Sequence, residues 1–300
     1  MIDLACPRCR APLAGSACDG CGEIYPIVAG IHRLLPNERL VHFQPFLQQY
    51  TAVRVAEGRL THSVEDFLRL PEPTPGDPFA WQWNLRRRTW STVHDRVLSQ
   101  LGSGLTVLDV GAGVGWLSNR LHELGHHPHA IDLTVDDHDG LGAAAVCDPP
   151  WPRYQAEMDA LPFADSQADL VVFNASLQYS TDYVRTIGEA LRVLRPDGRI
   201  VVMDTPVYRR DIDGRQMVEE RHADFERRFG TRSDHISSIE YITDAMLDEI
   251  GSRLGVRWKR HATWYGWAWA MRPWKARLLR RRRPSRFVVL VGTRGSTMNT

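Results

Sequence analysis

Three glycines and one aspartate follow a short apolar run in the middle of the chain. Residues 107–115 read Val-Leu-Asp-Val-Gly-Ala-Gly-Val-Gly, which places single residues between Gly111, Gly113 and Gly115. Glycine suits a tight turn from a strand into a helix, and it lets a ligand approach the backbone closely. Asp109 stands at the end of the strand, where a carboxylate disfavours a bound pyrophosphate and favours a cationic group. The spacing also departs from the dinucleotide pattern, whose third glycine comes one position later.

Two further acids follow at positions that suit a nucleoside. Asp132 ends the next predicted strand, from which a carboxylate can accept both hydroxyls of a ribose. Asp159 can accept the exocyclic amine of adenine, and Leu161 and Phe163 are predicted to line the ring. S-adenosyl-L-methionine combines adenosine with an ammonium group and a sulfonium, and it carries no phosphate. These residues therefore favour S-adenosylmethionine over a dinucleotide.

Four of the five cysteines lie within the first 21 residues as two Cys-x-x-Cys pairs: Cys6, Cys9, Cys18 and Cys21. In a cytosolic chain such crowding favours a metal over disulfides. Four thiolates suit one tetrahedral ion, and the usual iron–sulfur cluster spacings are absent, so we expect zinc rather than iron. No ligand position stays open, which predicts a structural rather than a catalytic metal.

Alternating strands and helices must position these residues. The predicted strands are 105–110, 129–133, 169–175, 200–204, 255–261 and 286–291, and the predicted helices are 79–98, 117–124, 182–194 and 243–254. Asp182 and Thr243 are predicted to cap the last two helices. Residues 196–198 (Pro-Asp-Gly) are predicted to form a turn. This alternation predicts a mostly parallel sheet covered by helices on both faces.

Residues 79–292 resemble the class I S-adenosylmethionine-dependent methyltransferases of the small-molecule type 11 kind. The resemblance rests on VLDVGAGVG, the strand that ends at Asp132, MDALPF before DLVVFNASLQY, and LRVLRPDGRIVVMD. It implies an α/β fold with a Rossmann-like, doubly wound sheet of seven strands, one of them antiparallel near the C-terminal end. It also implies an enzyme that transfers a methyl group from S-adenosylmethionine.

The resemblance further implies which residues contact the cofactor. The implied set is Asp109, Gly111, Ala112, Gly113, Gly115, Asp132, Leu133, Asp159, Ala160 and Asn174. Asn174 would face the transferable methyl group. Relatives often carry a histidine where this chain has Leu-Gln-Tyr at 177–179, so no catalytic base is assigned. Tyr179, Tyr208 and His222 are expected to have packing or surface roles.

The predicted domain organisation has three parts. Residues 1–36 form a zinc ribbon, residues 37–78 a linker or helical segment, and residues 79–300 the methyltransferase domain. A Pro-rich stretch at 71–76 is predicted to separate the head from that domain. A zinc-ribbon head on such a domain is similar to the bacterial rRNA guanine-N1 methyltransferases, and also to bacterial methyltransferases without an established RNA target.

The charge of the chain is unevenly distributed. The last 50 residues hold 13 Lys or Arg and no acid, whereas the first 250 hold 24 basic and 36 acidic residues. Five of the ten tryptophans, at 258, 264, 267, 269 and 274, precede or flank this basic run. Three interpretations compete for residues 264–286: contact with a membrane or a lipid-like substrate, a packed insertion, or stacking on single-stranded RNA. We favour the first.

The chain lacks a run of about 20 apolar residues, and its first residues lack the pattern of a signal peptide. A cytoplasmic enzyme, peripheral at the membrane through residues 264–286, is therefore expected. The preferred methyl acceptor is a small or lipid-like molecule. The alternative is an rRNA base, with the zinc ribbon as an RNA-binding head.

Overall fold

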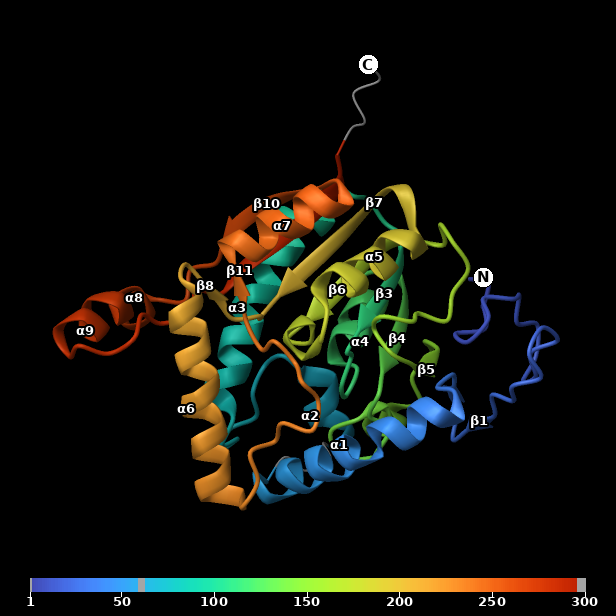
Figure 1. Cartoon of the computed structure of the whole chain (residues 1–300), viewed down its shortest axis with the longest axis horizontal. Coiled ribbons are helices and arrows are strands. Elements are labelled where there is room, and N and C mark those ends of the chain that lie inside the picture. The colour runs from blue at the N-terminus through green and yellow to red at the C-terminus, as the bar shows by residue number, and fades with distance from the viewer. Residues whose placement is uncertain (1, 59–62, 296–300) are drawn as a thin grey trace.

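The computed structural model describes residues 2–58 and 63–295, so the predicted ranges that reach residues 1, 59–62 and 296–300 extend beyond it. The strands are β1 (Ile27–Val28), β2 (Ile31–Arg33), β3 (Thr106–Val110), β4 (His127–Asp132), β5 (Arg153–Gln155), β6 (Ala168–Asn174), β7 (Leu194–Met203), β8 (Val207–Tyr208), β9 (Ile242–Thr243), β10 (Val256–Ala262) and β11 (Val288–Arg294). Within the described residues, nine of these strands form one sheet in the order β1-β2-β5-β4-β3-β6-β7-β11-β10 (Figure 1). The short pair β8–β9 lies outside it.

Seven neighbouring strands, in the sheet order β5-β4-β3-β6-β7-β11-β10, confirm the predicted doubly wound sheet. Strands β5, β4, β3, β6 and β7 are parallel, and β11 is antiparallel to both of its neighbours, β7 and β10. The head lengthens this sheet, because β2 pairs in parallel with β5 and β1 pairs with β2. The sequence had not predicted this pairing, which joins residues more than 100 positions apart.

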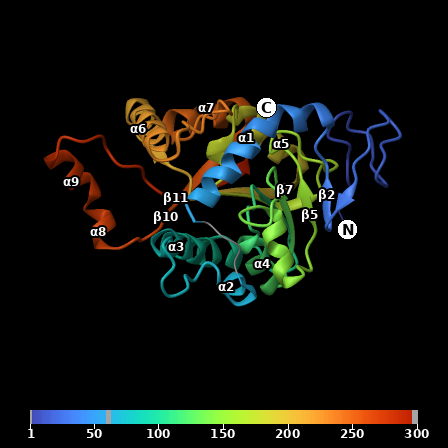
Figure 2. The same cartoon turned by 90° about the horizontal axis from the view of Figure 1, so that it is seen from below.

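Helices cover both faces of the sheet. The covering helices are α1 (Asn37–Ala56), α2 (Val64–Arg69), α3 (Ala80–Arg96), α4 (Trp116–Glu123), α5 (Tyr183–Val193), α6 (Asp211–Phe229) and α7 (Asp244–Leu254), whereas α8 (Trp267–Ala270) and α9 (Arg272–Leu278) lie away from the sheet. Figure 2 shows α2, α3 and α4 on one face and α1, α5, α6 and α7 on the other. Neighbouring residues of β3, Val107 and Leu108, are both fully buried, as expected for a strand covered on both sides. Within the described ranges, no helix combines the length and apolarity needed to cross a bilayer.

Local signals in the sequence predicted several element boundaries correctly. Asp182 Oδ1 accepts hydrogen bonds from the backbone of Val184 (2.9 Å) and Arg185 (3.0 Å), and Thr243 Oγ1 accepts one from Met246 (3.1 Å). Both predicted N-caps are therefore confirmed. The predicted turn at 196–198 falls inside β7, which continues through it. The pairing with β6 passes from Ala168–Leu194 to Leu170–Arg199, so these residues bulge out of the ladder without ending the strand.

The N-terminal head shares the core of the larger domain. Cys6, Cys18, Tyr25 and Leu34 belong to one cluster of buried side chains with residues of β3, β4 and α5. The backbone of Ala5 donates to Pro162 O at 3.1 Å. The Pro-rich stretch lies between α2 and α3 and does not hold the head apart from the sheet. The division into 1–36, 37–78 and 79–300 stays a prediction.

Candidate functional site

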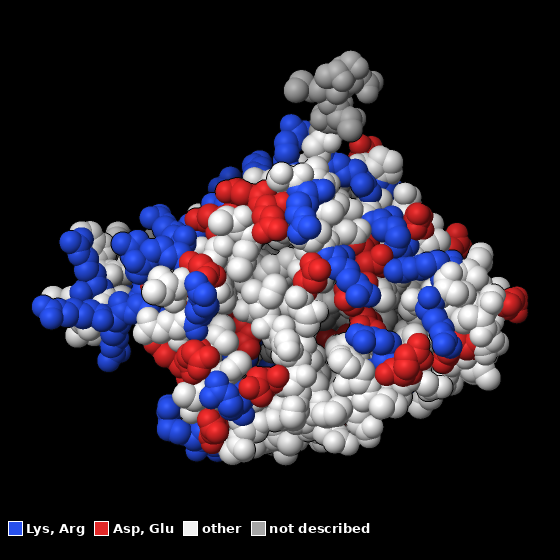
Figure 3. Space-filling view, in the orientation of Figure 1, with Lys and Arg blue, Asp and Glu red and all other residues white. Residues whose placement is uncertain are grey.

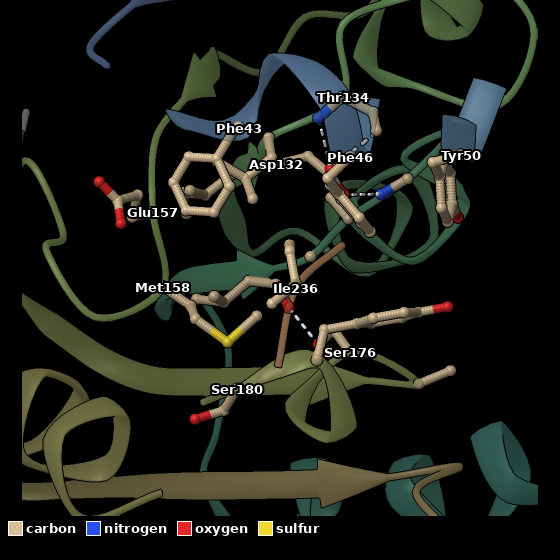
Figure 4. Close-up of a pocket in the computed structure, with 18 of the residues that line it drawn as sticks. Phe43, Phe46, Tyr50, Asp132, Thr134, Glu157, Met158, Ser176, Ser180 and Ile236 are labelled. Carbon is tan, nitrogen blue, oxygen red and sulfur yellow. Dashed lines mark hydrogen bonds between the residues drawn. The ribbon is translucent and has the colours of Figure 1, made fainter. Parts of the chain in front are cut away.

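A cavity of about 350 Å³ opens at the carboxyl ends of β3, β4 and β6 (Figure 4). Its lining comes from these strand ends, from α1 and from the loop that carries residues 235–237. From β3 the chain builds the sheet in one direction through β4 and β5, and it then continues with β6 on the other side of β3. Doubly wound sheets bind their ligands in the crevice at this switch point. The fold therefore places the cavity where a ligand is expected.

The loop between β3 and α4 has room only for glycine at two positions. Gly111 has a φ of +76°, and a Cβ built on it would lie 2.2 Å from Ser176 Cβ. Gly115 has a φ of +82°, and its Cβ would lie 2.3 Å from the Trp151 ring. A side chain at either position would meet both a strained backbone and a neighbouring side chain. The glycines thus let the loop pack closely while its backbone faces the cavity.

Asp132 holds this loop at the end of β4. Its Oδ2 accepts the backbone N–H of Gly113 at 2.7 Å, and its Oδ1 accepts the backbone N–H (2.8 Å) and the hydroxyl (2.7 Å) of Thr134. Figure 4 shows the carboxylate at the cavity wall. Burial raises the pKa of this carboxyl. Each carboxylate oxygen has two lone pairs, so Oδ2 keeps one acceptor position for a ligand hydroxyl.

Two buried oxygens near the cavity have no hydrogen-bond donor among the described residues: Asn174 Oδ1 and Asp109 Oδ1. Asn174 lies at the end of β6 and lines the cavity. Asp109 is fully buried, receives the Ser118 hydroxyl on Oδ2 at 2.9 Å, and has its pKa raised by burial to about 7. An acceptor without a donor is costly inside a protein. Asn174 Oδ1 therefore fits a ligand that brings N–H groups and positive charge, whereas the fully buried Asp109 lies outside the cavity lining.

Seven of the ten residues predicted to contact the cofactor line this cavity: Gly111, Ala112, Gly113, Asp132, Leu133, Asp159 and Asn174. The other three lie close by but outside its lining. Asp109 is buried beside Ser118, Gly115 precedes α4, and Ala160 lines a smaller hollow between the head and the domain.

The prediction that Leu161 and Phe163 line a ligand ring is wrong. Both side chains are fully buried in the core, and the Phe163 ring packs edge-on against Tyr154 at 5.2 Å between centroids. They turn inward because the head packs over this segment. Met158 lines the cavity instead.

Helix α1 supplies a wall of the cavity that sequence reasoning missed. Figure 4 shows Phe43, Phe46 and Tyr50 along one side, with Met158 on the other. These three side chains and Val53 recur at helical spacing, which was the available signal, but the spacing does not reveal what the helix covers.

Two ion pairs fasten α1 across the cavity. Near its first turn, Arg39 donates two hydrogen bonds of 2.6 Å to Glu157. Near its last turn, the Arg54 guanidinium lies 3.0 Å from Asp139 and donates to the Tyr50 hydroxyl at 2.8 Å. These ion pairs hold α1, the segment with Glu157 and the loop with Asp139 around the same cavity.

Of the three side chains expected to pack, only Tyr179 borders the cavity, where its ring lies 6.4 Å from that of Tyr50. His222 is buried and contacts Glu240 Oε1 at 2.7 Å, and Tyr208 packs edge-on against Tyr241. His222 and Tyr208 thus contact other side chains of the fold and do not line the cavity.

The four N-terminal cysteines converge. Their sulfur atoms lie within 4.8 Å of one another, with Cys6 and Cys18 buried and Cys9 and Cys21 exposed. Four thiols at this separation have the donor set of a tetrahedral thiolate site. The predicted cluster is thus compatible with a small zinc ribbon.

Residues 108–202 match the methyltransferase domain family. The chain is 34% identical over 102 residues to malonyl-[acyl-carrier protein] O-methyltransferase of Erwinia pyrifoliae, covering 33% of this chain and 37% of that protein. It is 35% identical over 109 residues to the ubiquinone/menaquinone biosynthesis C-methyltransferase of Roseobacter denitrificans, covering 34% and 43%. The match thus spans only about two fifths of the length of these relatives.

The fold is also similar to that of a solved methyltransferase. The 1,6-didemethyltoxoflavin-N1-methyltransferase of Burkholderia thailandensis, whose structure contains S-adenosylhomocysteine, aligns with a TM-score of 0.50 and 15% identity over 85% of this chain and 90% of that one. Residues 108–202 are therefore a methyltransferase domain, set in the Rossmann-like fold of the S-adenosylmethionine-dependent methyltransferases.

Proposed function

We propose that this protein binds S-adenosylmethionine in the cavity and transfers its methyl group to a small or lipid-like acceptor. The observation that carries the proposal is the meeting of the glycine loop, Asp132 and the donor-free Asn174 Oδ1 at one switch point of the sheet. The bound cofactor would supply a methyl group activated by its sulfonium. The chain itself has to bind, orient and shield the reactants.

Each part of the cofactor has a proposed site. Gly111, Ala112 and Gly113 would run beside the methionine part, with Asp109 and Gly115 supporting the loop from behind. Asn174 would approach the ammonium or methyl end, because its Oδ1 needs a donor.

The ribose would bind at Asp132, next to Leu133. The adenine would lie towards Asp159 and Ala160, where Phe43 and Met158 provide apolar surface. Asp159 also contacts Arg185 at 3.2 Å, so its carboxylate would be shared between the arginine and an adenine amine.

Alignment is the main catalytic contribution that these residues can make. Holding an acceptor in line with the methyl group can contribute up to about 7–11 kcal/mol to lowering the barrier. Helix α1 would assist by covering the reactants with Phe46 and Tyr50. No side chain is assigned as a general base, which is needed only for an acceptor that is protonated at neutral pH.

The acceptor class is supported by the wall of the cavity and by the named relatives. Aromatic and aliphatic side chains, including Phe46 and Ile236, form part of the cavity lining. The relatives' names describe transfer to a malonyl group on acyl-carrier protein and transfer in quinone biosynthesis. Together these favour a small or lipid-like acceptor. An acceptor of that kind also agrees with peripheral membrane contact through residues 264–286, which we include in the proposal.

Replacing Asp132 by alanine should weaken S-adenosylmethionine binding about 5- to 150-fold, because unpaired buried hydroxyls cost about 1–3 kcal/mol. Calorimetric titration of the purified protein measures this directly. The exposed Asp197, replaced by alanine, is the matched control and should bind like the wild type. Unchanged affinity in Asp132→Ala, in a protein that melts normally, would show that the ribose does not lie at β4.

We also propose that Cys6, Cys9, Cys18 and Cys21 bind one structural zinc ion. The proposal is supported by the convergence of the four sulfur atoms and by the small size of the head, which has little core of its own. Metal analysis of freshly purified, reduced protein should find one zinc per chain. Replacing the distant Cys147 by serine should leave that stoichiometry unchanged, whereas iron or metal-free protein would refute the zinc assignment.

A further inference from the structure

A helical arm, defined here as residues 264–286, projects from the body of the protein between β10 and β11 (Figures 1 and 2). Helices α8 and α9 form its outer part. Backbone hydrogen bonds from Met271 N to Trp267 O (3.0 Å) and from Lys275 N to Met271 O (3.1 Å) carry the helical pattern across their junction. The side chains of both helices therefore follow one helical periodicity.

The base of the arm is fixed to the domain. Tyr265 is buried, and its hydroxyl lies 2.7 Å from Thr89 Oγ1 on α3. The Trp269 ring stacks on Phe287 with 5.5 Å between centroids, and Arg88 donates to Trp264 O at 3.2 Å. The packed-insertion interpretation is correct for this inner part. This fixed base holds the outer part of the arm away from the body.

A stripe of large apolar side chains on the outer part faces solvent. Trp267, Met271, Trp274 and Leu278 are separated by four, three and four residues, as on one face of a helix. They are 78%, 54%, 68% and 84% exposed. An amphipathic helix normally buries such a face in the core, and exposed apolar patches of this kind mark contact surfaces.

Basic residues accompany this stripe. Lys275, Arg277, Arg280 and Arg281 are exposed, and no carboxylate in the described part of the chain lies within ion-pair distance of them. By contrast, Arg282 of the same run is paired with Glu220 on α6. Figure 3 shows the resulting group of basic side chains over the arm. The arm thus offers an apolar face together with four basic side chains that have no ion-pair partner among the described residues.

We propose that the stripe enters the headgroup layer of an anionic lipid bilayer while the four basic side chains contact lipid phosphates. The inference rests on the peripheral membrane contact of the proposed function, and it adds the contact face and the class of lipid. Tryptophan favours the membrane interface, and leucine and methionine can reach the acyl boundary below it. Clustered lysine and arginine are attracted to a negatively charged leaflet.

The composition of the stripe favours lipid over RNA. Single-stranded nucleic acids are held by aromatic rings on which successive bases stack. Here Met271 and Leu278 occupy two of the four positions and offer no ring. The first 250 residues are also acidic overall, with 36 acidic against 24 basic residues, which opposes an extended RNA backbone.

The test is co-sedimentation of the full-length protein with vesicles of phosphatidylcholine, with and without phosphatidylglycerol. The stripe variant is Trp267→Ser/Trp274→Ser/Leu278→Ser. Its control replaces three comparably exposed apolar side chains elsewhere, Val41, Trp81 and Ile212, with serine. The S-adenosylmethionine affinity and melting temperature of each protein are measured in parallel.

The charge variant replaces Lys275, Arg277, Arg280 and Arg281 with glutamine. Its control replaces four exposed arginines of the body with glutamine: Arg209, Arg227, Arg228 and Arg253. Both sets remove the same net charge from the surface, but within residues 2–58 and 63–295 Arg227 and Arg228 are ion-paired with Asp224 and Arg253 with Glu249, unlike the four residues of the arm. A parallel titration with single-stranded oligouridylate tests the RNA alternative.

We expect the wild type to sediment with the phosphatidylglycerol vesicles and to leave them as salt rises. The stripe variant should lose this binding, and the charge variant should bind at least about tenfold more weakly. Both controls should sediment like the wild type. Failure of the wild type to sediment, wild-type binding by the stripe variant, or tighter binding to oligouridylate than to vesicles would overturn the inference. The cofactor affinity tests the methyltransferase proposal separately, because none of the replaced residues lines the cavity.

Discussion

Replacing Gly111 by alanine will lower both the stability of the protein and its affinity for S-adenosylmethionine. The new Cβ would lie 2.2 Å from Ser176 Cβ in a backbone that already has a φ of +76°. Left-handed backbone costs a non-glycine residue about 1–2 kcal/mol, and forced overlap typically adds about 1–3 kcal/mol. Relief of the overlap would push the loop into the cavity, so cofactor affinity should fall by more than about tenfold.

Gly102 provides a matched control for this effect. It has a φ of +84°, but nothing lies within 4 Å of the position its Cβ would take, so Gly102→Ala measures the backbone cost alone. Adding Ser176→Gly to Gly111→Ala should restore part of the lost stability, since it removes the Ser176 Cβ that the new alanine Cβ would overlap. Chemical denaturation and calorimetric titration give the two quantities. Equal behaviour of the Gly111 and Gly102 variants would contradict a role for the close approach.

Loss of the proposed zinc ion from the head should destabilise the whole chain and weaken cofactor binding. The buried Cys6 and Cys18 share the core with the sheet, and β2 pairs with β5 beside β4. Arg10, which follows the first cysteine pair, donates to Leu161 O (3.0 Å) and lies 2.8 Å from Glu189. The segment that carries Asp159 therefore depends on an ordered head. Chelation or Cys18→Ser should lower the free energy of unfolding by more than about 4 kcal/mol.

The shape of the unfolding transition distinguishes this expectation from an independent head. We expect one cooperative transition that moves to lower temperature, together with a reduced affinity for S-adenosylmethionine. Cys147→Ser, which changes a cysteine outside the cluster, should show neither effect. Two separate transitions with an unchanged cofactor affinity would instead mean that residues 1–36 fold and melt alone, as the predicted domain division suggests.

The accuracy of the sequence-based prediction depended on how local each signal was. The caps at Asp182 and Thr243 and the glycine loop after β3 are set by neighbouring residues, and the structure has them where the sequence put them. The partner of β2 is set by contacts between segments far apart in the chain, so no local pattern predicted it. Leu161 was misplaced for the same reason, since the head determines which side of that segment is buried.

Helix α1 shows the same limit for the candidate site. Phe43, Phe46 and Tyr50 are visible in the sequence at helical spacing, which predicts a helix with one apolar face. The spacing does not tell whether that face meets the core or a cavity. Its ion pairs to Glu157 and Asp139, which fix the answer, join residues more than 80 positions apart.

The pairing of β2 with β5 has a consequence for how the protein behaves in a concentrated solution. Without the head, β5 would be the edge strand of the sheet, and its free backbone groups would form a template for pairing with another chain. With the head in place the sheet ends at β1, which is two residues long and so offers little to pair with. At the opposite edge, β10 displays the exposed basic side chains of Arg257, Lys259 and Arg260, of which Arg260 is paired with Asp244. Charged side chains on an edge strand disfavour pairing with a second copy. Both edges therefore disfavour aggregation through strand pairing, the β1 edge because it is short and the β10 edge because it is charged.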